Sequence, residues 1–196
     1  MSQILELTMT ERVCDSDALR CAAFDCAERA GEQSACLVQV HTADAGTVLV
    51  MVNVGAGEAS AVLPLPTREE TIGWAERFDF PAGTFLISER PCAETLKQAQ
   101  TALPEAKRIF ALSLDRETAR FETLLHDRET GETRPVRRTA EGAAAAAMLL
   151  HRELQDGTME ITVGQPGGIL EIGLRKEAGR VLGLSAGGPV RMEGEP

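Results

Sequence analysis

An internal repeat constrains the fold of this chain more than any other feature of its sequence. Shifting the sequence by 122 places superimposes Leu37 on Met159 and Gly46 on Gly168, and the apolar alternation stays in phase along the whole stretch. A repeat of this length indicates one supersecondary unit used twice. The 196 residues therefore suit two small units that share a core.

Each copy of the repeat has the pattern of three antiparallel strands. The first reads LVQVHTADAGTVLVMVNVGAGEASAVL and the second MEITVGQPGGILEIGLRKEAGRVLGL, with alternating apolar positions bounded by glycines. A helix is predicted before each copy, over about 17–30 and 140–155. The first carries a polar stripe of Asp17, Arg20, Asp25 and Glu28, whereas the second is apolar all round between Gly142 and Leu150. A helix without a polar face is expected to be buried on all sides.

About eighty residues lie between the copies and belong only to the second half. They predict a polar linker or helix over 66–77, strands over 84–88, 108–114 and 119–126, a helix over 93–102, and an exposed hairpin or mobile loop over 127–138. The first half has only Ile4–Met9 before its helix. We expect a shortened first lobe over 1–63 and a second lobe over 64–186. The first would be completed by a C-terminal strand within 187–196, around Val190–Met192, or by a partner chain, and either arrangement leaves an edge that favours a homodimer.

Composition excludes several classes of partner. The chain has 20 Lys and Arg against 30 Asp and Glu, a net charge of −10. This charge repels phosphate, so neither a nucleic acid nor an anionic membrane is an expected partner. No apolar stretch of transmembrane length occurs. Five cysteines, an odd number, and an N-terminus without a leader pattern predict a cytoplasmic protein with free thiols.

The predicted architecture resembles the diaminopimelate epimerase-like superfamily, in particular its PhzF-like branch. The similarity lies in CDSDALRCAA before the first helix, RRTAEGAAAAAMLL at the second helix, and VGQPGGILEI and GGPVRMEGE near the end. It implies an α+β fold of two pseudo-symmetric lobes, each a curved, mostly antiparallel sheet around a central helix. It also implies a cofactor-independent isomerase or cyclase whose acid/base residues lie between the lobes, where two helix N-termini face each other and bind an anion.

Three residues are candidates for proton transfer in such a site. Asp15 and Cys14 precede the first helix, and Glu141 lies in the first turn of the second. Two carboxylates facing one cleft form a natural acid/base pair. A structural role is equally compatible with the sequence, because Asp15 or Ser16 suits the N-cap of the first helix and Glu141 suits the dipole of the second.

The remaining candidates would bind the substrate, a small molecule with a carboxylate or an enolisable carbonyl. They are Ser16, Asp17, His41, Arg138, Thr139 and Gly142. Arg138 follows Arg137 in a chain with few positive charges and would bind a carboxylate bidentately, although a solvated pair is as consistent with the sequence. Thr139 is also the expected cap of the second helix.

The sequence favours neither a metal nor an organic cofactor. The three histidines are far apart and show no ligand spacing. GQPGG and SAGG lack the lysine and the strand-loop-helix context of a phosphate loop, so they predict hairpin turns. The alternative to an isomerase is a ligand-binding or accessory protein that keeps the fold without the standard catalytic residues.

Overall fold

The computed structural model describes residues 4–10, 15–43, 46–153 and 155–190, which form one extended sheet and three helices. The N-terminal part, residues 4–63, contains β1 (Ile4–Met9), α1 (Ser16–Arg29), β2 (Ala35–Thr42), β3 (Gly46–Asn53) and β4 (Glu58–Leu63). The C-terminal part, residues 64–190, begins with β5 (Arg68–Ile72), β6 (Ala75–Phe80), β7 (Gly83–Ser88), α2 (Cys92–Ala102), β8 (Arg108–Asp115), β9 (Arg120–Asp127) and β10 (Thr133–Val136). It ends with α3 (Ala140–Leu150), β11 (Gly157–Gln165), β12 (Gly168–Glu177) and β13 (Arg180–Gly187).

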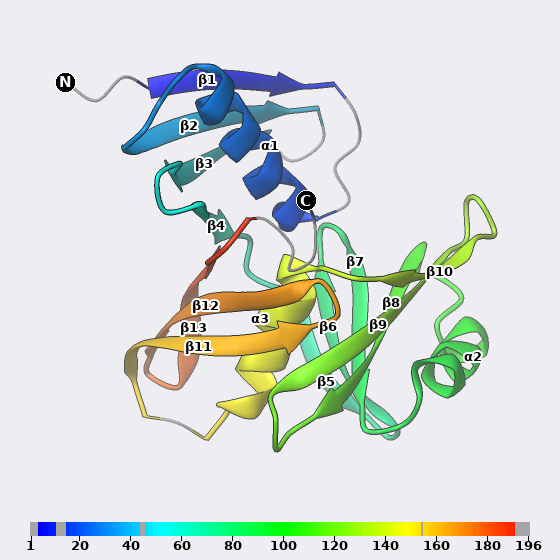
Figure 1. Ribbon diagram of the computed structural model, residues 1–196. Helices are drawn as coiled ribbons and strands as arrows, with labels where there is room; N and C mark the ends of the chain where they lie inside the picture. The colour runs from blue at the N-terminus through cyan, green and yellow to red at the C-terminus, as the bar shows by residue number, and fades with distance from the viewer. Residues whose placement is uncertain (1–3, 11–14, 44–45, 154, 191–196) are drawn as a thin grey trace.

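The sheet runs in the order β1-β2-β3-β4-β13-β12-β11-β9-β8-β7-β6-β5, with β10 paired to β9 (Figure 1). Neighbouring strands are antiparallel except for the pairs β1·β2, β7·β8 and β9·β11. The two parts are joined at β4 and β13, where Leu63 pairs with Leu184 and Ala61 with Ala186.

The predicted repeat is confirmed by the bounds of the elements. A shift of 122 carries the start of β3 at Gly46 onto the start of β12 at Gly168, and Glu58 at the start of β4 onto Arg180 at the start of β13. The order α1-β2-β3-β4 is thus repeated as α3-β11-β12-β13. Because β4 pairs with β13, the strands of the two copies are arranged symmetrically about this pair.

Each helix of the repeat packs on its own three strands. Leu19, Phe24 and Ala27 of α1 form a buried cluster with Val38 and Val52. In α3 every side chain from Ala140 to Leu149 is buried, as predicted, and those from 143 to 147 are fully inaccessible. Alanines allow strands to approach the backbone of α3 closely, which accounts for a core with few aromatic residues. A third cluster lies under α2, around Leu96 and Ile109.

Most of the elements predicted between the copies are confirmed, but the interpretation of 66–77 as a linker or helix is wrong. This stretch holds β5 and the beginning of β6, which pair with each other as a hairpin. The charged residues of β5 are exposed, whereas Arg77 of β6 is 5% exposed and pairs with Asp79 and Glu105. Ion pairs therefore allow charged side chains within a sheet, where the composition suggested a polar linker.

Two other expectations need correction. The second helix ends at Leu150 instead of about residue 155. The polar stripe of the first helix is divided, because Asp17 and Arg20 are buried while Asp25 is exposed. The last described strand ends at Gly187, and residues 188–190 continue beside β4 through hydrogen bonds from Ala59 N–H to the Gly188 carbonyl and from Val190 N–H to the Gly57 carbonyl. Met192 lies outside the described residues.

Candidate functional site

The N-termini of α1 and α3 meet where the N-terminal and C-terminal parts contact each other. Each begins with a residue in extended backbone conformation whose side chain caps its own helix. Asp15 Oδ1 accepts the Asp17 N–H at 2.8 Å, and Thr139 Oγ1 accepts the Gly142 N–H at 3.1 Å. The predicted cap at Thr139 is confirmed, and of the two residues expected to suit the first helix, Asp15 is the cap, because Ser16 is the first residue of α1.

A carboxylate at the start of each helix also accepts hydrogen bonds from the start of the other helix. Asp15 Oδ1 accepts the Ala140 N–H at 2.8 Å, and its Oδ2 accepts the Thr139 hydroxyl at 2.5 Å. In return, the Glu141 carboxylate accepts the Ser16 N–H at 3.1 Å and the Ser16 hydroxyl. Four N–H groups that could bind an anionic ligand at these helix ends, those of Ser16, Asp17, Ala140 and Gly142, are thus already bonded to side chains of the chain itself.

Burial and the nearby charge of Glu141 raise the pKa of Asp15 well above its ordinary value. The hydrogen bonds from Ala140 and Thr139 act in the opposite direction, because they favour the ionised form, but the first two effects dominate. A carboxyl group whose pKa is raised by burial and by a like charge is suited to give and take protons near neutral pH.

Two buried guanidinium groups lie beside this carboxylate pair. Arg20 is inaccessible to solvent and donates to Asp17 Oδ1 at 2.7 Å. Arg138 Nη2 donates to the same Asp17 oxygen at 3.3 Å, while its Nε lies 3.1 Å from Oδ2 without the alignment of a hydrogen bond. Asp17 therefore pairs with both arginines. We expected Arg138 to bind a substrate carboxylate, and in this structure it binds the carboxylate of Asp17.

Both arginines also bind the C-terminal segment 188–190. Arg20 Nη2 donates to the Gly188 carbonyl at 2.9 Å, and Arg138 donates to the Pro189 and Val190 carbonyls, both at 3.1 Å. These bonds reach from α1 and from the residue before Thr139 to one stretch of backbone. The guanidinium groups thus connect the two helix N-termini to the last described residues.

The place where the N-termini of α1 and α3 meet is called the junction below. Some of the other predicted site residues lie there, and others lie elsewhere in the fold. Gly142 is at the junction, where a Cβ atom would lie 2.5 Å from Thr139 Cγ2, so its lack of a side chain is required by packing. His41 lies on β2 and bonds Thr47 at 3.1 Å, and no hydrogen bond or ion pair joins it to the junction residues. Cys14 lies outside the described residues. Burial raises the pKa of Cys21 to about 11, which agrees with a packing role for that thiol.

No group of three or more His, Cys, Asp or Glu side chains within the described ranges is placed to hold a metal ion. None of the three helices described has both the length and the apolar character needed to cross a bilayer.

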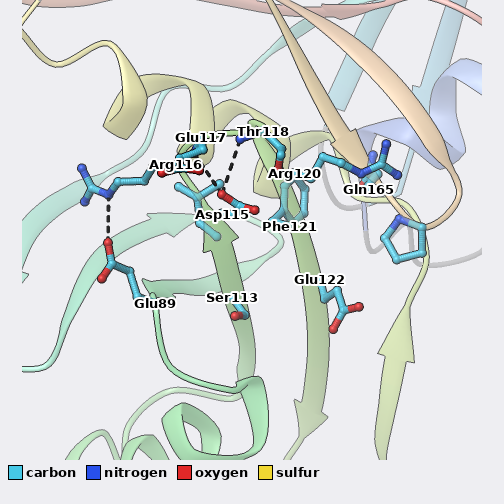
Figure 2. A pocket seen from close by; sticks show the side chains of 12 residues that line it. Glu89, Ser113, Asp115, Arg116, Glu117, Thr118, Arg120, Phe121, Glu122 and Gln165 are labelled. Atoms are coloured by element: carbon cyan, nitrogen blue, oxygen red, sulfur yellow. Dashed lines mark hydrogen bonds and ion pairs between the residues drawn. The ribbon is translucent and has the colours of Figure 1, made fainter.

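A hollow with a volume of about 990 Å³ lies beside the junction (Figure 2). Its wall is formed by residues 113–122 around the β8–β9 turn, by Glu89, and by Gln165 and Pro166 at the β11–β12 turn. Asp15 and Glu141 do not line it. Gln165 connects the two places, because it lines the hollow while its Oε1 accepts the Thr139 N–H at 2.9 Å.

Sequence reasoning missed Gln165 and Arg20. GQPGG was interpreted correctly as a turn, and the turn joins β11 to β12. The pattern did not indicate that the glutamine would contact the α3 N-cap, 26 positions earlier. Arg20 was placed on a polar stripe because its charge suggested exposure. Its only local signal was the acidic residue three positions before it, a spacing that allows an ion pair on a helix.

Comparison with solved structures identifies the fold. A predicted epimerase from Pseudomonas aeruginosa is similar, with a TM-score of 0.59, 16% identity, and coverage of 89% of this chain and 70% of the other. A hydroxyproline epimerase from Agrobacterium vitis with bound trans-4-hydroxy-L-proline has a TM-score of 0.56 and 14% identity, with 87% and 63% covered. A Clostridium difficile protein described as a PhzC/PhzF protein of phenazine biosynthesis has a TM-score of 0.53 and 14% identity, with 88% and 68% covered.

These similarities confirm an α+β, mostly sheet architecture shared with the two epimerases and the PhzC/PhzF protein, here with three helices among the described residues. At these identities they establish the fold alone. No family model matches the sequence, and no curated protein matches it. The chain spans 63% of the length of the hydroxyproline epimerase.

Asp15→Asn will change how stability depends on pH. A folded-state pKa above the unfolded value means that the wild type loses stability as pH rises from about 4 through the folded pKa, by at most about 1.4 kcal/mol per pH unit. The side-chain oxygen of the asparagine can still accept the backbone N–H groups of Asp17 and Ala140, and its NH₂ group can donate to the Thr139 hydroxyl oxygen. Urea unfolding from pH 4 to 8 should therefore show the variant gaining stability relative to the wild type as pH rises. A constant difference would contradict the raised pKa.

Adjacent arginines should respond differently to replacement. Arg138→Leu removes the partner of Asp17 and of two carbonyl groups, so we expect a loss of about 3 kcal/mol in the free energy of unfolding. Arg137→Leu, at an exposed neighbouring position, should change it by less than about 0.5 kcal/mol. Equal effects in chemical denaturation would show that Arg138 is not an internal ion-pair partner.

Proposed function

We propose that this protein is a cofactor-independent isomerase or cyclase of small molecules, with Asp15 as the proton-transferring residue. The observation that carries the proposal is the position of Asp15, hydrogen-bonded to both helix N-termini and to Thr139, with its pKa raised by burial and by Glu141. The substrate would bear an acidic C–H bond next to a carboxylate or carbonyl. The trans-4-hydroxy-L-proline bound to the similar epimerase is a molecule of this class.

The charges of the junction suit such a reaction. Asp15, Asp17 and Glu141 together with Arg20 and Arg138 carry a net charge of −1 when every group is ionised, and of zero when Asp15 is protonated. If Asp15 accepts a proton from the substrate carbon, the bonding electrons stay on the substrate as an enolate. One negative charge has then moved from Asp15 to the ligand. The positive ends of two helices stabilise it in either place.

Returning the proton to another carbon, or to the other face of the same carbon, completes an isomerisation. In the first case Asp15 alone is sufficient, because it receives and releases the same proton. In the second case a protonated group on the opposite face must donate, and Glu141, in the first turn of α3, is the candidate: it would start as the acid and end as the carboxylate, while Asp15 keeps the proton that it accepted. Ser16 and Thr139 would orient the two carboxyl groups through their hydroxyls.

A specific observation favours a second candidate, a ligand-binding or accessory protein without catalysis. The backbone donors at the helix ends are already bonded within the chain, and Arg138 pairs with Asp17, so a substrate anion must replace internal partners or bind elsewhere. Exchange of substrate hydrogen with solvent distinguishes the candidates, because binding alone does not labilise a C–H bond.

Asp15→Asn should abolish hydrogen exchange if Asp15 transfers the proton. We would incubate small carboxylic acids with an acidic C–H, starting with trans-4-hydroxy-L-proline, with the protein in D₂O and follow deuterium incorporation by NMR. The expected loss of rate in the variant is at least about 100-fold. Asp25→Asn, at an exposed position of the same helix, is the matched control and should retain the wild-type rate.

Full activity in Asp15→Asn would exclude Asp15 as the acid or base. Binding of an acid by the wild type without any deuterium incorporation would instead favour the accessory protein.

The proposal also concerns architecture and assembly. It takes 1–63 and 64–186 as the two lobes of the fold, facing each other at the helix N-termini, with 187–196 or a partner chain completing the first. The bonds of residues 188–190 to Gly57 and Ala59 support the first of these alternatives. A cytoplasmic location is part of the same proposal.

A homodimer is proposed because β1 and β5 end the strand order, each with one edge unpaired among the described strands. Sedimentation velocity should give the mass of two chains. A stable single chain at micromolar concentration would contradict the dimer.

A further inference from the structure

Gln165 has a hydrogen-bond donor that the protein does not use. The residue is 2% exposed, and its Oε1 accepts the Thr139 N–H. Its Nε2 is buried without a hydrogen-bond partner among the described residues, although Gln165 lines the hollow beside the junction. Buried amide groups are normally hydrogen-bonded, so a donor left free at the wall of a hollow indicates an acceptor that arrives with a ligand.

Arg120 lines the same hollow as Gln165. Its side chain runs along Gly164, the residue before Gln165, so closely that a Cβ atom there would be 2.9 Å from Arg120 Cγ and 3.4 Å from Nε. Figure 2 shows Arg120 and Gln165 among the residues that line the hollow. No hydrogen bond or ion pair joins Arg120 to another described side chain. A guanidinium group and an amide N–H in the wall of one hollow can both donate to a carboxylate.

The remaining charges of the hollow restrict the anion. Glu89 pairs with Arg116 at 3.6 Å, and Asp115 accepts the backbone N–H groups of Glu117 and Thr118. The exposed Glu122 carboxylate also faces this hollow (Figure 2). These acidic groups repel a ligand with several negative charges and can accept hydrogen bonds from hydroxyl or ammonium groups.

We propose that the hollow binds a small monocarboxylate that also carries a hydroxyl or ammonium group, with its carboxylate between Gln165 Nε2 and the Arg120 guanidinium. Asp15 and Glu141 already bond the helix N-termini, so in this proposal the ligand's carboxylate is bound by Gln165 and Arg120 instead. Gln165 would place the ligand beside Thr139, because one amide group contacts both. The inference rests on the proposed function for its role in turnover, but its test measures binding alone.

L-lactate, with one carboxylate and one hydroxyl, is the probe. Titration into ¹⁵N-labelled protein should shift the side-chain NH₂ signal of Gln165 and the Nε–H signal of Arg120 in a saturable way, with one dissociation constant in the roughly millimolar range. Succinate and inorganic phosphate should bind at least about fivefold more weakly, because they bring more negative charge to the hollow. Phosphate binding as tightly as lactate would overturn the proposed ligand class.

Gln165→Glu is the decisive variant, since it keeps an oxygen for the Thr139 N–H and removes the Nε2 donor. Lactate affinity should fall at least about tenfold. Arg120→Leu, at an exposed position that tolerates replacement, should weaken binding in the same way and tests the site even if the first variant unfolds. Arg134→Leu, an exposed arginine on β10, is the matched control and should bind lactate normally.

Wild-type lactate affinity in either Gln165→Glu or Arg120→Leu would overturn the proposal. So would the absence of any lactate-dependent shift in the wild type. Such a failure is distinguishable from failure of the proposed function. Loss of deuterium exchange in Asp15→Asn without any lactate binding would leave the isomerase standing and remove this site, whereas binding without exchange would do the reverse.

Discussion

Two carboxylates that cross between helix N-termini determine how this molecule is held together. Asp15 caps α1 and also bonds the Ala140 N–H, while Glu141 returns the contact to Ser16. Each helix end therefore depends on a residue of the other, and separating them would leave backbone donors and charged groups without partners. These pairs are 124 or 125 residues apart in the sequence, so this contact is one of those that join the two copies of the repeat.

The same contact links stability to chemistry. Three carboxyl groups and two guanidinium groups occupy the junction, and protonation of Asp15 makes their net charge zero. The C-terminal segment contributes only backbone carbonyls, which satisfy the remaining donors of Arg20 and Arg138 without adding charge. Loss or gain of one proton at Asp15 changes the net charge of this site only between −1 and zero. The proposed reaction moves that proton between Asp15 and a ligand.

The success of sequence reasoning differed between local and long-range features. The repeat predicted both helices and their strands, because apolar alternation and glycine turns are local signals. Residue preferences at helix starts predicted Thr139 as one cap and Asp15 or Ser16 as the other. The sequence did not show that Arg138 pairs with Asp17 or that Arg77 pairs with Glu105, because these partners lie far away along the chain. Gln165 was not predicted for the same reason. Its contact with the Thr139 N–H and its unpartnered Nε2 group depend on the folded structure.

The β4–β13 pair has a mechanical consequence. Among the described residues, β4 and β13 share three residue pairs, from Leu63–Leu184 to Ala61–Ala186, whereas β11 and β12 share nine. Residues 188–190 extend the contact through their backbone hydrogen bonds with Gly57 and Ala59. The two copies are therefore joined at two separate places, by this stretch of backbone pairing and by the crossed carboxylates of Asp15 and Glu141, and each helix remains packed on its own strands.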